Sequence, residues 1–222
     1  KEVVARAIGL SRYIPWNPQA LEFEEDFLQT FIPVNLSALS QTLLESELFG
    51  HRKGAFTGAL SDRKGYLEAA GQHGSIFLDE IGETSAETQV KLLRVLQTRE
   101  FNRIGETRSR RFDGKCVAAT NRDLATEVRE GRFREDLFYR LTADCIETPA
   151  LHACLQGNPA EMELLTRFIL RKVTGEEDKE TKKEVLAALE RVETHSWPGN
   201  FRELEQAVRQ ILIQGRYQPV KS

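Results

Sequence analysis

The sequence predicts an α/β fold with a mainly parallel sheet, followed by a small all-helical unit. Two short apolar runs, at 75–78 and 116–119, are typical of strands buried on both faces of a parallel sheet. Helical patterns separate these runs, and such alternation indicates a layered α/β unit. Strand patterns stop near Pro149, and only helical patterns follow. We therefore expect an α/β unit over 1–150 and a helical unit over 151–222.

The elements of the first unit follow from periodicity and turn residues. The helix at 85–99 is the most strongly patterned, because Val90, Leu93 and Leu96 recur at helical spacing. A glycine within an alternating stretch predicts a hairpin. In chain order we expect helices at 2–13, 42–49, 63–70, 85–99, 122–130 and 133–141, strands at 31–36, 75–78, 116–119 and 143–148, and a hairpin at 101–112.

Three helix starts mark the second unit. Asn158 followed by Pro159 is a cap followed by a favoured first helical residue, and Gly175 is a typical stop. The spacings at 181–184 and 200–203 match capping boxes, in which a polar cap is followed three residues later by glutamate. These patterns predict three helices that pack into a small helical lid.

Composition limits the classes of function. The chain has 222 residues with 29% charged residues and a net charge of −3, which does not suit a generic basic nucleic-acid binder. Three cysteines without a CxxC pair predict buried free thiols in a reducing compartment, and make a zinc site improbable. No apolar run approaches the roughly 18 residues of a membrane span. We expect a cytoplasmic protein without a membrane partner.

The most informative segment is a hexapeptide with a single aromatic residue. Two glycines permit positive φ and a tight reversal, so the segment suits neither a core helix nor a strand. Phe56 at its tip has little bulk around it, which favours a loop that touches a partner. A surface turn whose phenylalanine folds back onto the core is the alternative. The segment is Gly54, Ala55, Phe56, Thr57, Gly58 and Ala59.

Polar residues follow two of the predicted strands. Asp79 and Glu80 end the run at 75–78, and Thr120 and Asn121 end the run at 116–119. Parallel sheets bind ligands at the carboxyl edge of their strands. One carboxylate can hold Mg²⁺ through water while the other orients an attacking water. The alternatives are a solvated acidic pair and an asparagine that caps the next helix.

Three arginines are candidates for phosphate contact. Arg134 and Arg140 are six residues apart, which is about 240° around a helix, so they do not share a face. Arginine suits a transferring phosphoryl group because its fork neutralises charge at two points. Arg202 lies in a first helical turn, where a cation gains nothing from the helix dipole. Ion pairs with Glu135 or Asp136, and neutral surface placement of Arg202, are the alternatives.

Together these segments resemble a known family. The sequence is similar to the central AAA+ ATPase domain of bacterial enhancer-binding proteins, which activate sigma-54 RNA polymerase, and the resemblance covers nearly the whole chain. The rival interpretations are another AAA+ remodelling ATPase and a hydrolysis-deficient assembly or binding module. The matching motifs occur in family order: ESELFGHRKGAFTGA, GSIFLDEIGE, QVKLLRVLQ, AATNRDL, FREDLFYRL and WPGNFREL.

The resemblance implies ATP and Mg²⁺ as cofactors and assigns nucleotide roles. Lys1 matches the Walker A lysine, and Glu2 stands where other P-loop proteins have Ser or Thr. Asp79 matches the Mg²⁺ residue of Walker B, and Glu80 the residue that orients water. The remaining matches are the switch asparagine Asn35, which pairs with the Walker B glutamate, the sensor I residues Thr120 and Asn121, the arginines Arg134 and Arg140 presented to a neighbouring subunit, and the sensor II arginine Arg202.

The resemblance also implies partners. The loop at 54–59 matches the segment that grips sigma-54, and the hairpin at 101–112 resembles the second loop beside it. The family assembles as a homo-oligomeric ring, a hexamer, and binds promoter or enhancer DNA through a domain that is not in this chain. We expect ATP between subunits, and Asn35 to report the γ-phosphate state to the loop.

Two departures from the family pattern stand out. The strand and glycine-rich loop that precede the Walker A lysine are absent before Lys1. We therefore expect a trimmed or incomplete chain that would by itself bind ATP poorly. After Glu147 the family's charged Pro-Pro-Leu-Arg-Glu-Arg-like stretch is replaced by ETPALHACLQGNPAEM. This affects the expected linker to the lid rather than the site.

Overall fold

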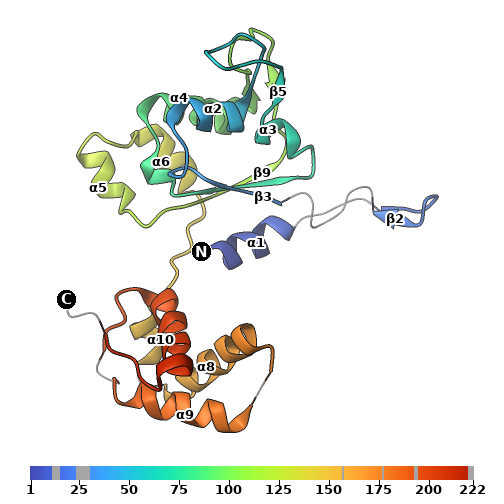
Figure 1. The fold of residues 1–222 in the computed structure, drawn as a ribbon. Coiled ribbons are helices and arrows are strands. Elements are labelled where there is room, and N and C mark those ends of the chain that lie inside the picture. Colours follow the sequence, from blue (N-terminus) through green and yellow to red (C-terminus); the bar gives the residue numbers. More distant parts are fainter. Residues whose placement is uncertain (12–15, 24–30, 157, 177, 193–194, 220–222) are drawn as a thin grey trace. The chain divides into compact units, whose positions relative to one another are not determined.

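The computed structural model describes residues 1–11, 16–23, 31–156, 158–176, 178–192 and 195–219. The chain divides into two compact units, Lys1–Cys145 and Ile146–Ser222, which are described separately (Figure 1). Among the described residues, no helix is both long and apolar enough to cross a membrane.

The first unit is built on a parallel sheet of three strands. The strands are β3 (Phe31–Asn35), β6 (Ser75–Asp79) and β9 (Lys115–Ala119), in the order β3-β6-β9. Both pairings are parallel and aligned, so Asn35, Asp79 and Ala119 lie opposite one another at the carboxyl edge. The predicted parallel sheet is confirmed, and polar residues that follow the strands meet at one edge.

Helix α1 (Glu2–Leu10) covers one face of this sheet (Figure 1). Ala5 packs against the side chains of Phe31 and Phe77, which point to this face. The carbonyl of Gly9 accepts a hydrogen bond of 2.8 Å from Ser75 Oγ, at the amino end of β6. The helix therefore runs antiparallel to the strands, and its N-terminus lies at their carboxyl edge.

Helices cover the opposite face (Figure 1). Alternate residues of the central strand, Ile76 and Leu78, enter the main core there with Leu48 and Leu137, and all four are at most 1% exposed. The helices of this unit that contribute to the core are α2 (Gln41–Phe49), α3 (Tyr66–Ala69), α4 (Ala86–Thr98), α5 (Leu124–Arg129) and α6 (Glu135–Leu141).

A buried leucine in the central strand should carry a large share of the stability. We expect Leu78→Ala to lower the free energy of unfolding by about 2–5 kcal/mol, because the cavity adds to the lost transfer energy. Leu60, 85% exposed, is the matched control, and Leu60→Ala should change stability by less than about 0.5 kcal/mol. Urea denaturation measures both. Equal midpoints for the two variants would contradict this packing.

Two loops project beside each other from the first unit (Figure 1). The first is closed by the pairing of β4 (Gly50–His51) with β5 (Arg63–Lys64). The second is the predicted hairpin, confirmed as β7 (Glu100–Phe101) paired antiparallel with β8 (Arg110–Arg111). The backbone of Ile104 joins them, because it accepts from Arg52 N–H at 3.0 Å and donates to the Gly50 carbonyl at 2.9 Å.

A further antiparallel pair joins β1 (Trp16–Asn17) and β2 (Glu22–Phe23).

Three sequence predictions for this unit were wrong in detail. Residues 143–148 form no strand: they are exposed, and no described strand pairs with them. The segment 63–70 begins as β5, so only its second half is helical. Cys145, expected to be buried, is exposed.

The second unit is helical, as predicted. It contains α7 (Leu151–Leu155), α8 (Pro159–Thr174), α9 (Lys179–Glu190) and α10 (Asn200–Gln214). Its core includes Ile169, Leu189, Leu204 and Val208, each at most 2% exposed. Gly175 ends α8 with φ 77°, as its role as a stop requires.

The helix caps of this unit differ from the predicted boxes. Asp178, rather than Thr181, caps α9: its carboxylate accepts from the Thr181 N–H at 2.7 Å. The side chain of Asn200 accepts from the Leu151 N–H at 3.0 Å and so ties α7 to the start of α10. Glu203 accepts from the Gly199 N–H at 2.8 Å. The contact of Asn200 with Leu151 and the cap formed by Asp178 thus replace the side-chain caps expected from Asn200 and Thr181.

Candidate functional site

The carboxyl edge of the sheet brings together residues from three distant segments. Asp79 ends β6 and Glu80 follows it, while Thr120 and Asn121 follow β9. Lys1 joins them from the N-terminus of α1, which lies at this edge. The parallel register alone explains why residues 35, 79 and 120 meet. Lys1 lies at the same edge because α1 runs antiparallel to the strands.

Glu80 lies at the centre of this edge. Lys1 Nζ is 3.7 Å from its Oε1, and the Asn121 N–H donates to its Oε2 at 3.3 Å. Its own N–H donates to Asp79 Oδ1 at 3.1 Å. The backbone of Glu80 is left-handed, with φ 59° and ψ 46°. Such a conformation costs a residue with a side chain on the order of 1–3 kcal/mol and is concentrated at functional sites.

The side chains of Asn35 and Thr120 have local partners. Asn35 Oδ1 accepts from the Ser37 N–H at 2.9 Å and from its hydroxyl at 2.8 Å. Thr120 Oγ1 accepts from the Arg122 N–H at 3.0 Å. Asn35 lies opposite Asp79 in the sheet register. Its pairing with Glu80 stays a prediction, because its amide oxygen is turned to Ser37.

The start of α1 is suited to an anion. Lys1 is the N-cap residue and provides no side-chain hydrogen bond to the helix. The first N–H groups of an α-helix lack intrahelical partners, and the helix dipole favours negative charge there. Glu2 is exposed in this first turn. Lys1 adds a positive charge at the same end, so a phosphate at this edge would meet both.

The donor set also fits a magnesium ion. Mg²⁺ is typically bound in phosphoryl-transfer sites by one or two carboxylates, phosphates and water. Asp79 accepts through Oδ1 from the Glu80 N–H, and no described residue donates to its Oδ2. Asp79 with Glu80 therefore supplies the carboxylates that such a site needs. No described group of three acidic, histidine or cysteine side chains forms a metal cage of its own.

Arg134 and Arg140 lie at opposite ends of α6 and do not share a partner. Arg134 is the exposed N-cap residue, and its guanidinium forms two bonds with Asp136, at 3.0 and 2.7 Å. This is one of the alternatives that the sequence left open. The hydrogen bonds from Arg134 lower the pKa of the Asp136 carboxyl below its usual range. Arg140 donates to the Leu96 carbonyl at 3.0 and 3.2 Å.

Arg202 belongs to the second unit. It lies in the first turn of α10 and is exposed. Within the described part of that unit, no side-chain hydrogen bond or ion pair of Arg202 is found. Its guanidinium is therefore available to a ligand, and its role in nucleotide binding stays a prediction.

The loop at 54–59 is a compact turn with an exposed tip. Gly54 and Gly58 have φ values of 81° and 100°, which side-chain-bearing residues rarely adopt. The Gly54 N–H donates to the Ala59 carbonyl at 2.8 Å and closes the turn. The half-buried ring of Phe56 packs edge-on against His51, with centroids 5.0 Å apart. Phe56 thus folds partly back, while Thr57 and Gly58 are exposed.

Charged side chains hold the base of the two loops. Arg103 is 8% exposed and forms a bidentate pair with Glu68, at 2.8–3.1 Å. Arg110 contacts Glu68 at 3.2 Å and Glu106 at 3.1 Å. Bidentate arginine pairs fix geometry as well as charge. The loops therefore have a rigid base below a tip built from small residues.

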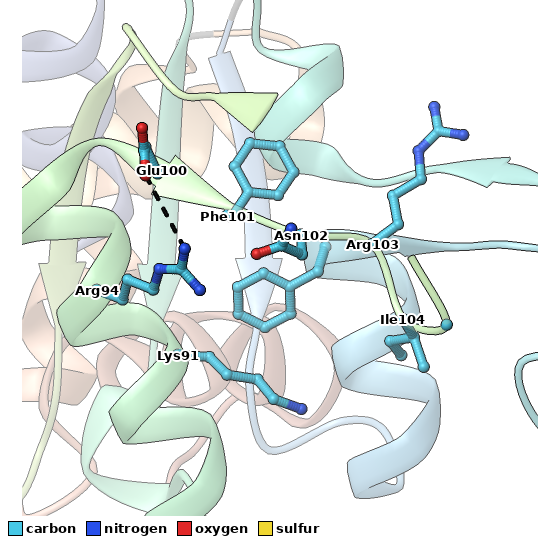
Figure 2. A pocket seen from close by; sticks show the side chains of 9 residues that line it. Lys91, Arg94, Glu100, Phe101, Asn102, Arg103 and Ile104 are labelled. Carbon is cyan, nitrogen blue, oxygen red and sulfur yellow. Dashed lines mark ion pairs between the residues drawn. The ribbon is translucent and has the colours of Figure 1, made fainter. Parts of the chain in front are cut away.

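A hollow in the first unit is separate from the carboxyl edge. It has a volume of about 310 Å³ and lies between α4 and the base of the hairpin. Figure 2 shows Lys91 and Arg94 of α4 among the residues that line it, with Arg94 3.9 Å from Glu100. Arg103 extends away from it, toward Glu68. None of the predicted nucleotide residues lines this hollow.

Two residues near the edge were missed by sequence reasoning. Gln89 is buried in α4, and Arg122 follows Asn121 and binds Glu83 at 2.5 Å. A glutamine within an amphipathic helix gives no local signal of its partners. The position of Arg122 directly after the predicted sensor I residues Thr120 and Asn121 is the signal that could have pointed to it.

The fold and the edge residues together define an AAA+ α/β unit followed by a helical lid. The chain belongs to the family of sigma-54 interaction domains, whose model matches residues 1–147. The model of the AAA+ ATPase lid domain matches residues 159–221. The family resemblance expected from the sequence is thus confirmed.

Similar proteins are bacterial regulators. The chain is 48% identical over 183 residues to the Nif-specific regulatory protein of Azotobacter vinelandii, covering 82% of the chain and 34% of that protein. It is 43% identical to the transcriptional regulatory protein ZraR of Escherichia coli K12, covering 98% of the chain and 46% of ZraR. The chain therefore spans less than half the length of these relatives.

A solved structure shows the same fold. Crystal structures of NtrX from Brucella abortus in complex with ADP and with ATP each align with a TM-score of 0.70, at 31% and 30% identity. These alignments cover all of this chain and 44–46% of NtrX.

Proposed function

We propose that this chain is an ATP-hydrolysing activator domain that remodels sigma-54 RNA polymerase at promoters and drives open-complex formation. The observation that carries the proposal is the position of Glu80, whose carboxylate is held by Lys1 and by Asn121 at the carboxyl edge. The family match and the NtrX complexes with ADP and ATP support a nucleotide at this edge.

Each residue of the edge has a role in this proposal. Lys1 neutralises β- and γ-phosphate charge, beside the free N–H groups of α1. Glu80 orients the attacking water, and Asn121 senses the γ-phosphate. Asp79 would hold Mg²⁺ through water, and the ion when bound would neutralise phosphate charge. Glu2, Thr120 and the lid residue Arg202 complete the nucleotide contacts.

Hydrolysis also requires a neighbouring subunit. Arg134 and Arg140 lie outside the edge that holds Glu80, and Arg134 is exposed at the N-terminus of α6. A ring of identical subunits, a hexamer in our proposal, would place these arginines against the ATP of the next subunit. Arg134 must leave Asp136 to reach a phosphate, which an exposed ion pair permits because such pairs are worth only about 0–1 kcal/mol.

In this proposal the loop at 54–59 transmits the effect of ATP hydrolysis to sigma-54. Asn35 lies in register with Asp79, so it can report the γ-phosphate state to the rest of the unit. The loop would then rise and present Phe56 and Thr57 to sigma-54. Binding to promoter or enhancer DNA belongs to another part of the full-length protein, and we place the protein in the bacterial cytoplasm.

Loss of the Phe56 ring should weaken sigma-54 binding at least tenfold without affecting ATP hydrolysis. We expect Phe56→Ala in the full-length protein to reduce sigma-54 binding at least tenfold in a complex with an ATP transition-state analogue. Within the part of the chain that the structure describes, the aromatic partner of this ring is His51, which has no proposed nucleotide role, so ATP turnover should remain near that of the wild type. Leu60→Ala is the control. Native gel shifts with purified sigma-54 measure binding, and unchanged binding by Phe56→Ala would refute the proposed contact.

A further inference from the structure

A buried amide joins the two halves of the proposed catalytic apparatus. Gln89, in the first half of α4, is 1% exposed. Its Nε2 donates to the Thr84 carbonyl at 2.9 Å and to the Arg132 carbonyl at 3.0 Å. Its Oε1 accepts from the Arg134 N–H at 2.9 Å. Both donor hydrogens and the acceptor of the amide are therefore used.

The partners of Gln89 are backbone groups of two functional segments. Thr84 follows the short helix η1 (Ile81–Glu83), which begins directly after Glu80. Arg132 and Arg134 belong to the segment that presents the proposed arginine to the neighbouring subunit. Gln89 thus fixes the backbone of Arg134 relative to η1, the segment that directly follows the proposed catalytic residue Glu80. Removing the buried amide would leave its backbone partners without hydrogen bonds, which loosens the position of Arg134.

A second, charged link runs between the same segments. Arg122 binds Glu83 at 2.5 and 2.7 Å and Glu127 at 3.2 Å. Arg132 binds the same Glu127 at 2.7 and 2.8 Å. Hydrogen bonds from Arg132, and then from Arg122, lower the pKa of Glu127 to about 2. Glu127 therefore stays ionised at neutral pH and holds both arginines.

The segment after Glu80 also lies close to the sensor strand. A Cβ on Gly82 would lie 2.9 Å from Thr120 Oγ1 and 3.2 Å from Arg122 Cδ. Only glycine allows this approach without a shift of these neighbours. A displacement of Thr120 would thus push directly on Gly82 in η1. Movement of η1 would in turn shift Thr84, whose carbonyl is bonded to Gln89.

We propose that Gln89 is a positioning residue that couples a subunit's own nucleotide site to the arginine that it presents to its neighbour. The inference rests on the proposed function, in which Arg134 acts on the ATP of the next subunit. The subunit's site then governs, through the backbone of Glu80 and η1 and through Gln89, where the N-terminus of α6 holds Arg134. Glu80→Gln leaves this backbone path in place. Gln89 itself touches no substrate.

The test compares two glutamines of the same helix. Gln89→Met keeps the length of the side chain and removes all three hydrogen bonds. We expect ATP turnover of the full-length protein to fall about 10²-fold, the cost of a misplacement of about 1 Å, with ATP binding retained. Gln97→Met is the matched control, because Gln97 is exposed on α4 and should leave turnover unchanged. If Gln89→Met does not fold, Gln89→Glu, which keeps the shape, replaces it.

Mixed rings separate positioning from a merely structural role. Glu80→Gln subunits have an inactive site but an intact arginine, so mixing them with Gln89→Met subunits should restore turnover above that of either variant alone. Mixing Gln89→Met with Arg134→Ala should restore nothing, because both subunits present a defective arginine. The inference would be overturned if Gln89→Met recovered turnover with Arg134→Ala but not with Glu80→Gln. That result would show that Gln89 supports only the nucleotide site of its own subunit.

A third mixture tests the underlying function. Arg134→Ala with Glu80→Gln should recover turnover if the arginine acts between subunits. Failure of this mixture would refute the arrangement between subunits and the inference with it. If Arg134→Ala recovers turnover with Glu80→Gln but Gln89→Met does not, the role of Gln89 is refuted and the arrangement between subunits stands.

Discussion

Replacing Glu80 with glutamine should lower ATP turnover by about 10²–10⁴-fold, the usual contribution of a group that activates water. The amide keeps the size of the side chain and can still accept from the Asn121 N–H, but it cannot take a proton. ATP binding should persist, because Lys1 remains and loses only a 3.7 Å ion pair. Phosphate release and binding of a fluorescent ATP analogue measure the two effects separately.

The matched control for this prediction is Glu87→Gln. Glu87 is an exposed glutamate in the first turn of α4, bonded to Gln41 at 2.8 Å. It should retain full turnover, which excludes a general effect of removing one negative charge. Turnover by Glu80→Gln within twofold of the wild type would refute its catalytic role.

Replacing Arg134 with alanine should lower turnover by about 10³-fold or more, the range found for arginines that stabilise a transferring phosphoryl group. Arg134 is exposed, so the variant should unfold at nearly the wild-type temperature. Circular dichroism melting and phosphate release measure these two properties, and the variant should still bind ATP at its own site.

Asp136→Ala decides between the two interpretations of Arg134. If the ion pair with Asp136 is the whole role of the arginine, both variants should behave alike. If Arg134 acts on phosphate, Asp136→Ala should retain most turnover, since the arginine remains. Equal losses in both variants would contradict the proposed role.

Much of the fold could be predicted because its strands carry strong local signals. The apolar runs at 75–78 and 116–119 became β6 and β9, and the hairpin at 101–112 formed as expected. The strand expected at 143–148 did not form, since a strand requires a neighbour to pair with and sequence periodicity does not reveal one.

The site was predictable where it depends on strand ends. Asp79, Glu80, Thr120 and Asn121 meet because parallel strands end at one edge, which follows from topology. The hydrogen bonds of Gln89 join residues 43 and 45 positions apart, and they depend on the packing of α4 against α6. Such contacts leave no local pattern.

The most direct test of the account measures ATP turnover and promoter opening in parallel. The full-length protein is incubated with sigma-54 RNA polymerase and a promoter that carries a fluorescent base at the melted region. We predict that the wild type hydrolyses ATP and opens the promoter, that Glu80→Gln does neither, and that Phe56→Ala hydrolyses ATP without opening it. Promoter opening by Phe56→Ala at the wild-type rate, or opening by Glu80→Gln, would contradict the claim that hydrolysis acts through this loop.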